Sequence, residues 1–151
     1  MTRLGIRVFG MICLLLSATS VHAQAAPVGL ARVDPGELAW IKSAQTGSHS
    51  AFIVGEPSKP GTYVVRTRFV PGQRVEPHFH PDERIVVVLS GTVYFGYGEQ
   101  FDESKMKALP AGSVWTEPSK QAHYAWAKDG EAVIQIVGHG PSSVTPIQSK
   151  Q

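Results

Sequence analysis

The stretch HFHPDERIVVVLSG, residues 78–91, begins with two histidines one residue apart and continues as an apolar, largely β-branched run that ends in glycine. Because side chains alternate between the two faces of a strand, His78 and His80 are predicted to point the same way, roughly 7 Å apart. Two imidazoles so placed can share one metal ion. Arg84 and Glu76 have the same parity and are expected on that side if no bulge interrupts the strand.

The chain begins with the three parts of a secretory signal peptide, predicted for residues 1–23. Arg3 and Arg7 precede an apolar run, and small residues lead to a cleavage site after Ala23. The run is shorter than the roughly 20 residues of a membrane span. We therefore expect a periplasmic or secreted protein that leaves the membrane once the signal is cleaved. The single cysteine, Cys13, lies in this segment, so the mature protein is expected to have no disulfide or thiolate chemistry.

The mature protein is expected to be nearly neutral. Cleavage would remove two of the 14 basic residues and leave 12 against 12 acidic ones. The sequence contains no basic run, so nucleic acid is not an expected partner.

Short strands separated by glycine and proline dominate the rest of the chain and indicate an all-β sandwich or barrel. Residues 61–72 alternate in polarity as a strand with one buried face does, whereas residues 84–90 form a continuous apolar run that suits a strand buried on both sides. Residues 99–112 are predicted to be a polar loop with one helical turn. Lys128-Asp129-Gly130 is predicted to be a hairpin turn between the last two strands.

The domain boundaries follow from this pattern. We predict an N-terminal arm over residues 24–44, which includes a short turn or helix, and a β domain over residues 45–140. A proline-containing tail over residues 141–151 is predicted to form an edge or an arm.

The spacing of glycines and histidines resembles the first motif of the cupin superfamily, G-x5-H-x-H-x3,4-E-x6-G. Gly72, His78, His80 and Gly91 match this motif, and Arg84 stands at the glutamate position. The resemblance is to small exported bacterial cupin-domain proteins in particular.

The second cupin motif, G-x5-P-x-G-x2-H-x3-N, is matched less fully. Gly112, Pro118 and His123 keep its spacing, while the turn glycine is missing and Ala127 replaces the asparagine. The resemblance implies a single antiparallel cupin β-barrel of the jelly-roll type, made of two facing sheets. It also implies that His78, His80 and His123 hold one divalent metal ion, which could be Zn, Fe, Mn, Ni or Cu.

The arginine at the glutamate position leaves three interpretations open. Arg84 stays protonated and cannot replace a carboxylate ligand, but beside a three-histidine ion it could clamp an anionic substrate. Alternatively, a bulge could turn Glu83 inward as the fourth ligand and Arg84 outward. In the third interpretation no metal binds, and Arg84 pairs with Glu76 or Glu83.

Other polar and aromatic residues give weaker predictions. Glu76 is the candidate catalytic residue, as a general base or as a partner that orients a histidine, although an exposed ion pair is an equal alternative. Tyr94 and Gln135 are candidate substrate contacts, with barrel filling as the alternative for Tyr94. His49 and His139 lack ligand spacing and are expected at the surface. A further set is expected in the core or at an oligomer interface: Trp115, Tyr124 and Trp126.

Together these features predict a metal-dependent enzyme of the dioxygenase, isomerase or lyase type that acts on a small anionic molecule. A barrel that binds a small ligand or the metal without turnover is the alternative, and a structural or partner-binding barrel is the third. The resemblance also implies pairing through an edge strand, so a homodimer is expected.

Overall fold

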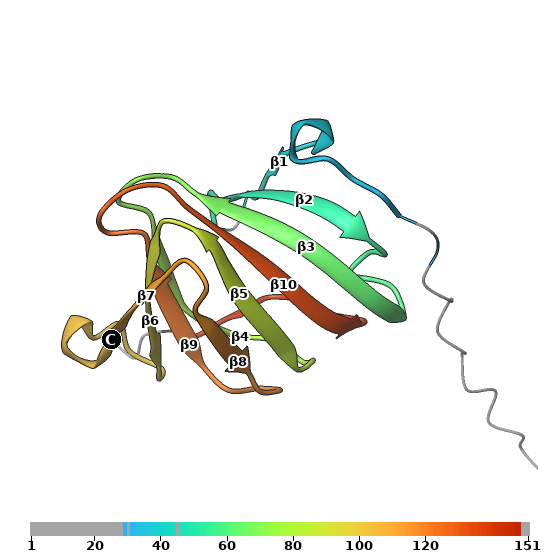
Figure 1. Ribbon diagram of the computed structural model, residues 1–151. Helices are drawn as coiled ribbons and strands as arrows, with labels where there is room; N and C mark the ends of the chain where they lie inside the picture. The colour runs from blue at the N-terminus through green and yellow to red at the C-terminus, as the bar shows by residue number, and fades with distance from the viewer. Residues whose placement is uncertain (1–28, 30, 45, 149–151) are drawn as a thin grey trace, which may run out of the picture.

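The computed structural model describes residue 29, residues 31–44 and residues 46–148, which form two facing antiparallel β-sheets (Figure 1). The predicted signal peptide lies outside the described residues. The six-stranded sheet runs in the order β1 (Ile41–Lys42), β2 (His49–Val54), β3 (Gly61–Phe69), β10 (Ala132–Gly140), β5 (Arg84–Ser90) and β8 (Val114–Glu117). The five-stranded sheet runs in the order β11 (Thr145–Pro146), β4 (Arg74–Phe79), β9 (His123–Trp126), β6 (Thr92–Tyr97) and β7 (Lys107–Pro110). The all-β, jelly-roll prediction is confirmed.

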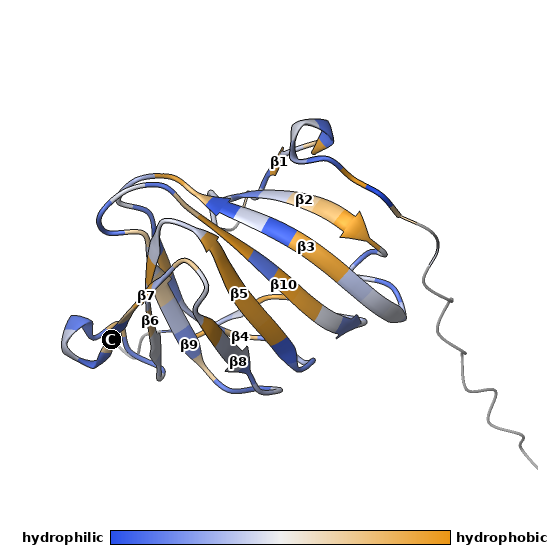
Figure 2. Cartoon of the chain, in the orientation of Figure 1, coloured by the Kyte–Doolittle hydropathy of each residue, from blue (hydrophilic) through white to orange (hydrophobic). Residues whose placement is uncertain are grey.

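The apolar core lies between the two sheets. On β3 the predicted alternation is confirmed, because Tyr63, Val65, Thr67 and Phe69 are buried and the residues between them are not. Figure 2 shows orange, pale and blue bands along β3, which mark its apolar and polar residues. Burial of one face in this way is the main stabilising contribution to a sheet, at about 25 cal/mol per Å² of apolar surface.

The prediction that residues 84–90 are buried on both sides is wrong. Val86 and Val88 face the core and are fully buried, whereas Ile85 and Leu89 point outward and keep about half of their surface exposed (54% and 41%). The strand is central in pairing, between β10 and β8, but no described helix covers the outer face of this sheet. An antiparallel sheet tolerates one solvent-facing side.

The predicted hairpin at Lys128-Asp129-Gly130 also does not form. The strands on either side belong to different sheets, since β9 pairs with β4 and β6 while β10 pairs with β3 and β5. The turn residues reverse the chain locally, but here they carry it from one sheet to the other. Turn chemistry specifies a local conformation and does not choose the pairing partner of a strand.

Both ends of the described chain are attached to the sheets. In the arm, a 3₁₀ turn η1 (Pro35–Glu37) is capped by Asp34, and β1 pairs with β2 of the same chain. The tail segment pairs through β11 with β4 and forms the edge of the five-stranded sheet, which agrees with the prediction of an edge or an arm. The loop at 99–112 contains the expected single turn, η2 (Glu103–Lys105), and also the unpredicted strand β7. Neither described helix is long and apolar enough to cross a membrane.

Candidate metal centre

His78 and His123 are directly opposed residues of neighbouring strands in the five-stranded sheet. Strand β4 carries one extra residue between Val75 and His78, where the register with β9 shifts. Such a bulge shifts the alternation of side chains between the two faces of the strand by one residue. Val75 and His78, three residues apart, therefore both line the cavity between the sheets. Pro77 lies within the irregular segment, and a proline inside a strand is a feature of edge strands and bulges.

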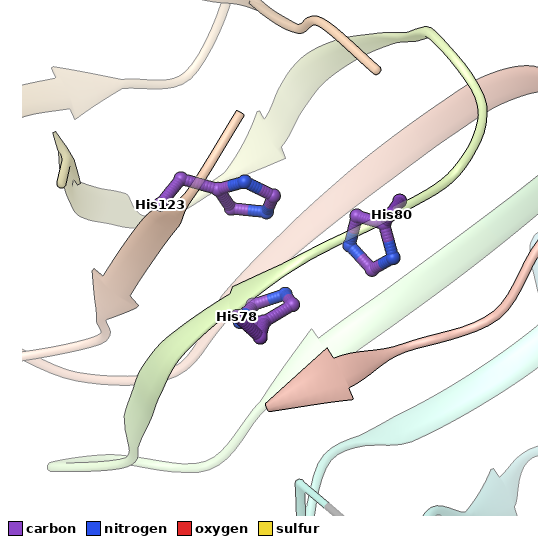
Figure 3. A group of neighbouring side chains, drawn as sticks. All are labelled: His78, His80 and His123. Carbon is purple, nitrogen blue, oxygen red and sulfur yellow. The ribbon is translucent and has the colours of Figure 1, made fainter. Parts of the chain in front are cut away.

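The three predicted histidines converge. His80 follows β4 directly and turns its ring toward His78 and His123, as Figure 3 shows. One ligand atom from each residue lies within 4.8 Å of the others. All three side chains are buried. The geometric prediction of three imidazoles from two distant parts of the chain is confirmed, and they could hold one metal ion.

Backbone carbonyls fix the protonation of each ring. Nδ1 of His78 donates to the carbonyl of Glu76 at 2.8 Å, Nδ1 of His80 to that of Ser143 at 2.7 Å, and Nδ1 of His123 to that of Gln121 at 2.9 Å. A carbonyl only accepts hydrogen bonds, so Nδ1 must carry the proton and Nε2 keeps its lone pair. Metal-bound histidines are oriented in this way in general.

The surroundings also keep the histidines neutral. Burial lowers the pKa of His78, with a further contribution from His123. Burial and the charge of Arg84 lower the pKa of His80 to about 3, and burial lowers that of His123 to about 4. A histidine must be neutral to bind a metal ion. All three are therefore in the binding form at neutral pH.

Glu76 does not lie where the parity of the sequence placed it. Its side chain is exposed on the outer face of β4, because the bulge places residues 76 and 78 on opposite faces of the strand. Only its backbone carbonyl reaches the cluster, through the hydrogen bond to His78. The expectation that the Glu76 carboxylate shares the histidines' face is wrong, and the proposed general base loses its geometric basis.

Arg84 does point inward, and its guanidinium is held by protein groups. Nε lies 3.4 Å from Oδ2 of Asp82, Nη2 donates to Oγ of Ser142, and Nη1 lies 3.8 Å from Oε2 of Glu117. Asp82 also accepts hydrogen bonds from Tyr63 Oη and, at 2.5 Å, from Ser142 Oγ. The arginine is thus fixed beside the histidines but is not a free two-point clamp.

This network shifts the protonation of its members. Burial and the hydrogen bond to Asp82 raise the pKa of Tyr63 to about 12. Burial alone would raise the pKa of Asp82, but the hydrogen bonds from Ser142 and Tyr63 and the charge of Arg84 lower it. Asp82 is therefore the ionised partner of Arg84. Gly138 leaves room for this contact, since a Cβ there would lie 2.3 Å from Tyr63 Oη.

The alternatives for the arginine position are corrected accordingly. Glu83 is exposed, so the interpretation in which a bulge turns it inward as a ligand is wrong. The partners of Arg84 are Asp82 and Glu117 rather than Glu76 or Glu83. Both actual partners depend on the fold: Asp82 through the turn before β5, and Glu117 through the pairing of β5 with β8.

Glu117 is the site residue that sequence reasoning missed. It is 6% exposed, and its Oε2 lies 3.6 Å from Nε2 of His123 and 3.8 Å from Nε2 of His80. Its Oε1 accepts a hydrogen bond from Trp115 Nε1 at 3.1 Å. Burial raises its pKa, although the charge of Arg84 opposes this. The available sequence clue was its place immediately before Pro118 of the second motif.

A cavity of about 540 Å³ opens onto the histidines. One part of its wall is apolar and aromatic, and another carries hydroxyl groups from Ser50 and Thr67, which hydrogen-bond each other at 3.2 Å. Ser142 and Ser143 of the predicted tail also line it. The apolar and aromatic part includes Val65, Phe69, Phe95, Trp115, Ile134 and Ile136.

The two predicted substrate contacts lie outside this cavity. Tyr94 faces the outside of the five-stranded sheet, where its hydroxyl donates to Asp129 at 2.8 Å. Gln135 lies on the outer face of β10 and accepts a hydrogen bond from Arg66 Nε at 3.1 Å. Ile134 and Ile136 line the cavity instead. The prediction failed because composition alone does not tell which parity of a strand faces inward.

The remaining aromatic residues divide between core and surface. Trp115 and Tyr124 are buried, as expected. Trp126 lies on the outer face of its sheet, beneath Arg74 at 4.4 Å and Lys128 at 4.9 Å. His139 is exposed as predicted, whereas His49 is half-buried.

Comparison with known proteins matches residues 65–138 to the family model described as "Cupin domain". A curated relative, germin-like protein 5-1 of Oryza sativa subsp. japonica, is 34% identical over 67 residues. That match covers 42% of this chain and 29% of the rice protein, so it reaches less than a third of that protein's length.

Solved structures share the fold at low sequence identity. The polyketide cyclase RemF of Streptomyces resistomycificus superposes with a TM-score of 0.68 at 15% identity, over 82% of this chain and 89% of that one. An RmlC-like cupin of Shewanella frigidimarina superposes with a TM-score of 0.59 at 15% identity, over 75% and 94% of the two chains. At such identities the likeness establishes the fold alone.

Proposed function

The chain belongs to the cupin superfamily, and we propose that it is a metal-dependent enzyme acting on a small organic molecule. The observation that carries this proposal is the convergence of three buried, neutral histidines on one cavity, each with Nε2 free. Such an arrangement leaves coordination positions open to a substrate, as catalytic sites do and closed structural sites do not.

The residues fit a divalent ion in their donor chemistry. Imidazole nitrogen suits Zn, Cu, Fe and Ni, while a nearby carboxylate extends the choice to Mn. For a protein that is exported, as we propose on the basis of residues 1–23, availability and the affinity series favour zinc or copper. A bound ion would supply Lewis acidity or, if redox-active, the activation of dioxygen.

The cavity wall supports a mostly apolar substrate with one polar end. Its aromatic and aliphatic residues would pack against the body of the molecule and exclude water, and the hydroxyl groups of Ser50 and Thr67 offer orienting hydrogen bonds. We propose that the end near the histidines is anionic. There Arg84, although paired with protein groups, adds positive potential without needing to move.

The reaction type stays open among dioxygenase, isomerase and lyase chemistry. RemF is named a polyketide cyclase, which supports enzymatic use of this fold but does not transfer that reaction to this chain. The exposed position of Glu76 favours the alternative, a barrel that binds a ligand or the metal without turnover, because it removes the predicted base.

Elemental analysis of the protein purified after export tests the metal. We expect about one equivalent of a divalent ion in the wild type and its loss in His78→Ala. His139→Ala is the matched control, since that histidine is exposed and its position in the sequence does not match the spacing of the three predicted ligands. If the wild type stays empty after incubation with zinc, manganese and iron salts, the metal-dependent function is wrong.

The anionic end can be tested on the Co²⁺-loaded protein. Acetate should shift its visible absorption bands at lower concentration than acetamide, which has the same shape without the charge. Equal responses to the two would contradict an anionic substrate.

We also retain homodimerisation as a proposal. The arm strand β1 pairs with β2 of its own chain and lies at the edge of the six-stranded sheet, so its other side is the edge through which we propose that two copies pair. Light scattering at micromolar concentration distinguishes a dimer from a monomer.

A further inference from the structure

We infer that Glu117 is a fourth metal ligand, which replaces the glutamate that the first cupin motif would place at residue 84. This inference rests on the proposed metal function and extends it to a residue that neither motif assigns. The carboxylate comes from β8 instead of β5, one strand away in the same sheet.

The first support is a buried carboxylate oxygen without a hydrogen-bond donor. Oε1 of Glu117 is satisfied by Trp115, but Oε2 is inaccessible to solvent and accepts no hydrogen bond from the described residues. A buried polar atom left unpaired costs free energy, so such atoms normally indicate a partner that protein atoms do not supply.

The second support is the direction of the neighbouring lone pairs. Nε2 of His80 and of His123 lie 3.8 and 3.6 Å from Oε2 of Glu117. Neither nitrogen carries a hydrogen to donate, because Nδ1 of each ring holds the proton through its carbonyl hydrogen bond. When Glu117 is ionised, electron pairs therefore converge on one buried space with no hydrogen between them, and a cation resolves that arrangement.

The third support is strand register. Arg84 and Glu117 are directly opposed partners on the β5–β8 ladder. Side chains of opposed residues lie on the same face about 5 Å apart, so a carboxylate at 117 reaches the region that one at 84 would occupy.

The charges in this region are also consistent with Glu117 as a ligand of a divalent ion. A divalent ion and Arg84 would bring three positive charges, and Asp82 and Glu117 two negative ones. The remaining positive charge matches a monoanionic substrate.

Competition titration of metal-free protein against a chromophoric chelator, with Zn²⁺ and with Co²⁺, tests the inference. We expect Glu117→Gln to weaken the Kd for Zn²⁺ by at least about 100-fold, since even residues that only support a ligand cost 10–100-fold. The Co²⁺ absorption spectrum should change as one oxygen donor is lost. Glu83→Gln, an exposed change nearby, should leave both unaltered.

A stability measurement separates a ligand from a structural residue. Metal-free Glu117→Gln should melt no lower than metal-free wild type, while the rise in melting temperature on adding Zn²⁺ should shrink. Glu117→Met, which fills the space without an oxygen donor, provides the same test if the glutamine variant does not fold.

The outcomes distinguish the two proposals. Zn²⁺ binding by Glu117→Gln within twofold of the wild type, with loss of binding in His78→Ala, would overturn this inference alone. A wild type that binds no metal would overturn the inference together with the proposed function.

Discussion

The His78–His123 pair of the five-stranded sheet and the Arg84–Glu117 pair of the six-stranded sheet form opposite walls of one cavity. Both are directly opposed residues on antiparallel ladders, yet they are held differently. The histidines are oriented by backbone carbonyls and are neutral. The arginine and the glutamate are oriented by side chains and by each other's charge.

This difference indicates that the two pairs contribute to the site in different ways. Backbone hydrogen bonds fix the histidine wall whatever the neighbouring side chains are, so its metal-binding geometry is preorganised. The charged wall depends on Arg84 compensating both Asp82 and Glu117, so removing the arginine leaves two buried carboxylates without their cation. Substitution of Arg84 should therefore mainly reduce stability, whereas substitution of the histidines should mainly reduce metal binding.

The largest expected effect is on the charged wall. Arg84→Gln removes the cation between two buried carboxylates, and loss of one partner of a buried ion pair costs about 3–5 kcal/mol. The free energy of unfolding of the metal-free variant, measured by urea denaturation, should fall by that amount. A loss below about 1 kcal/mol would mean that the network contributes no more than a surface ion pair.

Acid should act mainly on the histidine wall. Folded-state pKa values of about 3 for His80 and about 4 for His123 lie below the unfolded value near 6.5. The unfolded chain therefore binds more protons as the pH falls, and the metal-free protein should lose stability below pH 6.5. The loss is about 3 kcal/mol per histidine by pH 4.5, and it continues toward the folded pKa values.

Two other groups modify this profile. The raised pKa of Glu117 works in the opposite direction, since its folded form gains protons before the unfolded one. The lowered pKa of Asp82 adds a further loss at more acidic pH. Denaturation midpoints from pH 7 to pH 4.5 measure the sum, and His123→Gln should flatten the profile. A profile as steep as that of the wild type would contradict the burial argument.

A smaller effect is expected behind the charged wall. In Gly138→Ala the new Cβ would lie 2.3 Å from Tyr63 Oη and 2.9 Å from Asp82 Oδ2. Overpacking of this kind costs about 1–3 kcal/mol. Thermal unfolding should show the loss, and Zn²⁺ affinity should change less than stability. A shift in affinity alone would show that the two walls are more tightly coupled than their contacts indicate.

The smallest effect is expected at Glu76, and it tests the register of β4. Because that carboxylate is exposed, Glu76→Gln should change the stability by less than about 0.5 kcal/mol and leave the Zn²⁺ affinity unaltered. A large loss of affinity would place the carboxylate inside, as unbroken alternation predicts.

The histidine wall was the predictable part of the site. The short spacing of His78 and His80 predicted that pair, and the similarity to the cupin motifs added His123. The inward direction of Arg84 was also predicted, but its partners were not. Glu117 becomes its neighbour only through the β5–β8 ladder, over a separation of 33 residues that no local pattern records.

The residues that were predicted on the wrong face of a strand share one physical cause. Period-two alternation tells which residues share a face but not which face is inward, so Tyr94 and Gln135 were assigned to the cavity while Ile134 and Ile136 line it. A single bulge then reversed the parity between Val75 and His78 and placed Glu76 outside. Pro77 was the one residue in the sequence that could have indicated this bulge.

The most direct measurement is an anomalous-difference map from a crystal of the protein soaked in zinc. The account predicts one strong peak bonded to Nε2 of His78, His80 and His123, at the zinc–nitrogen distance of about 2.0–2.1 Å. A map with no peak among these rings, or with the peak bonded to Nδ1 of any of them, would contradict it.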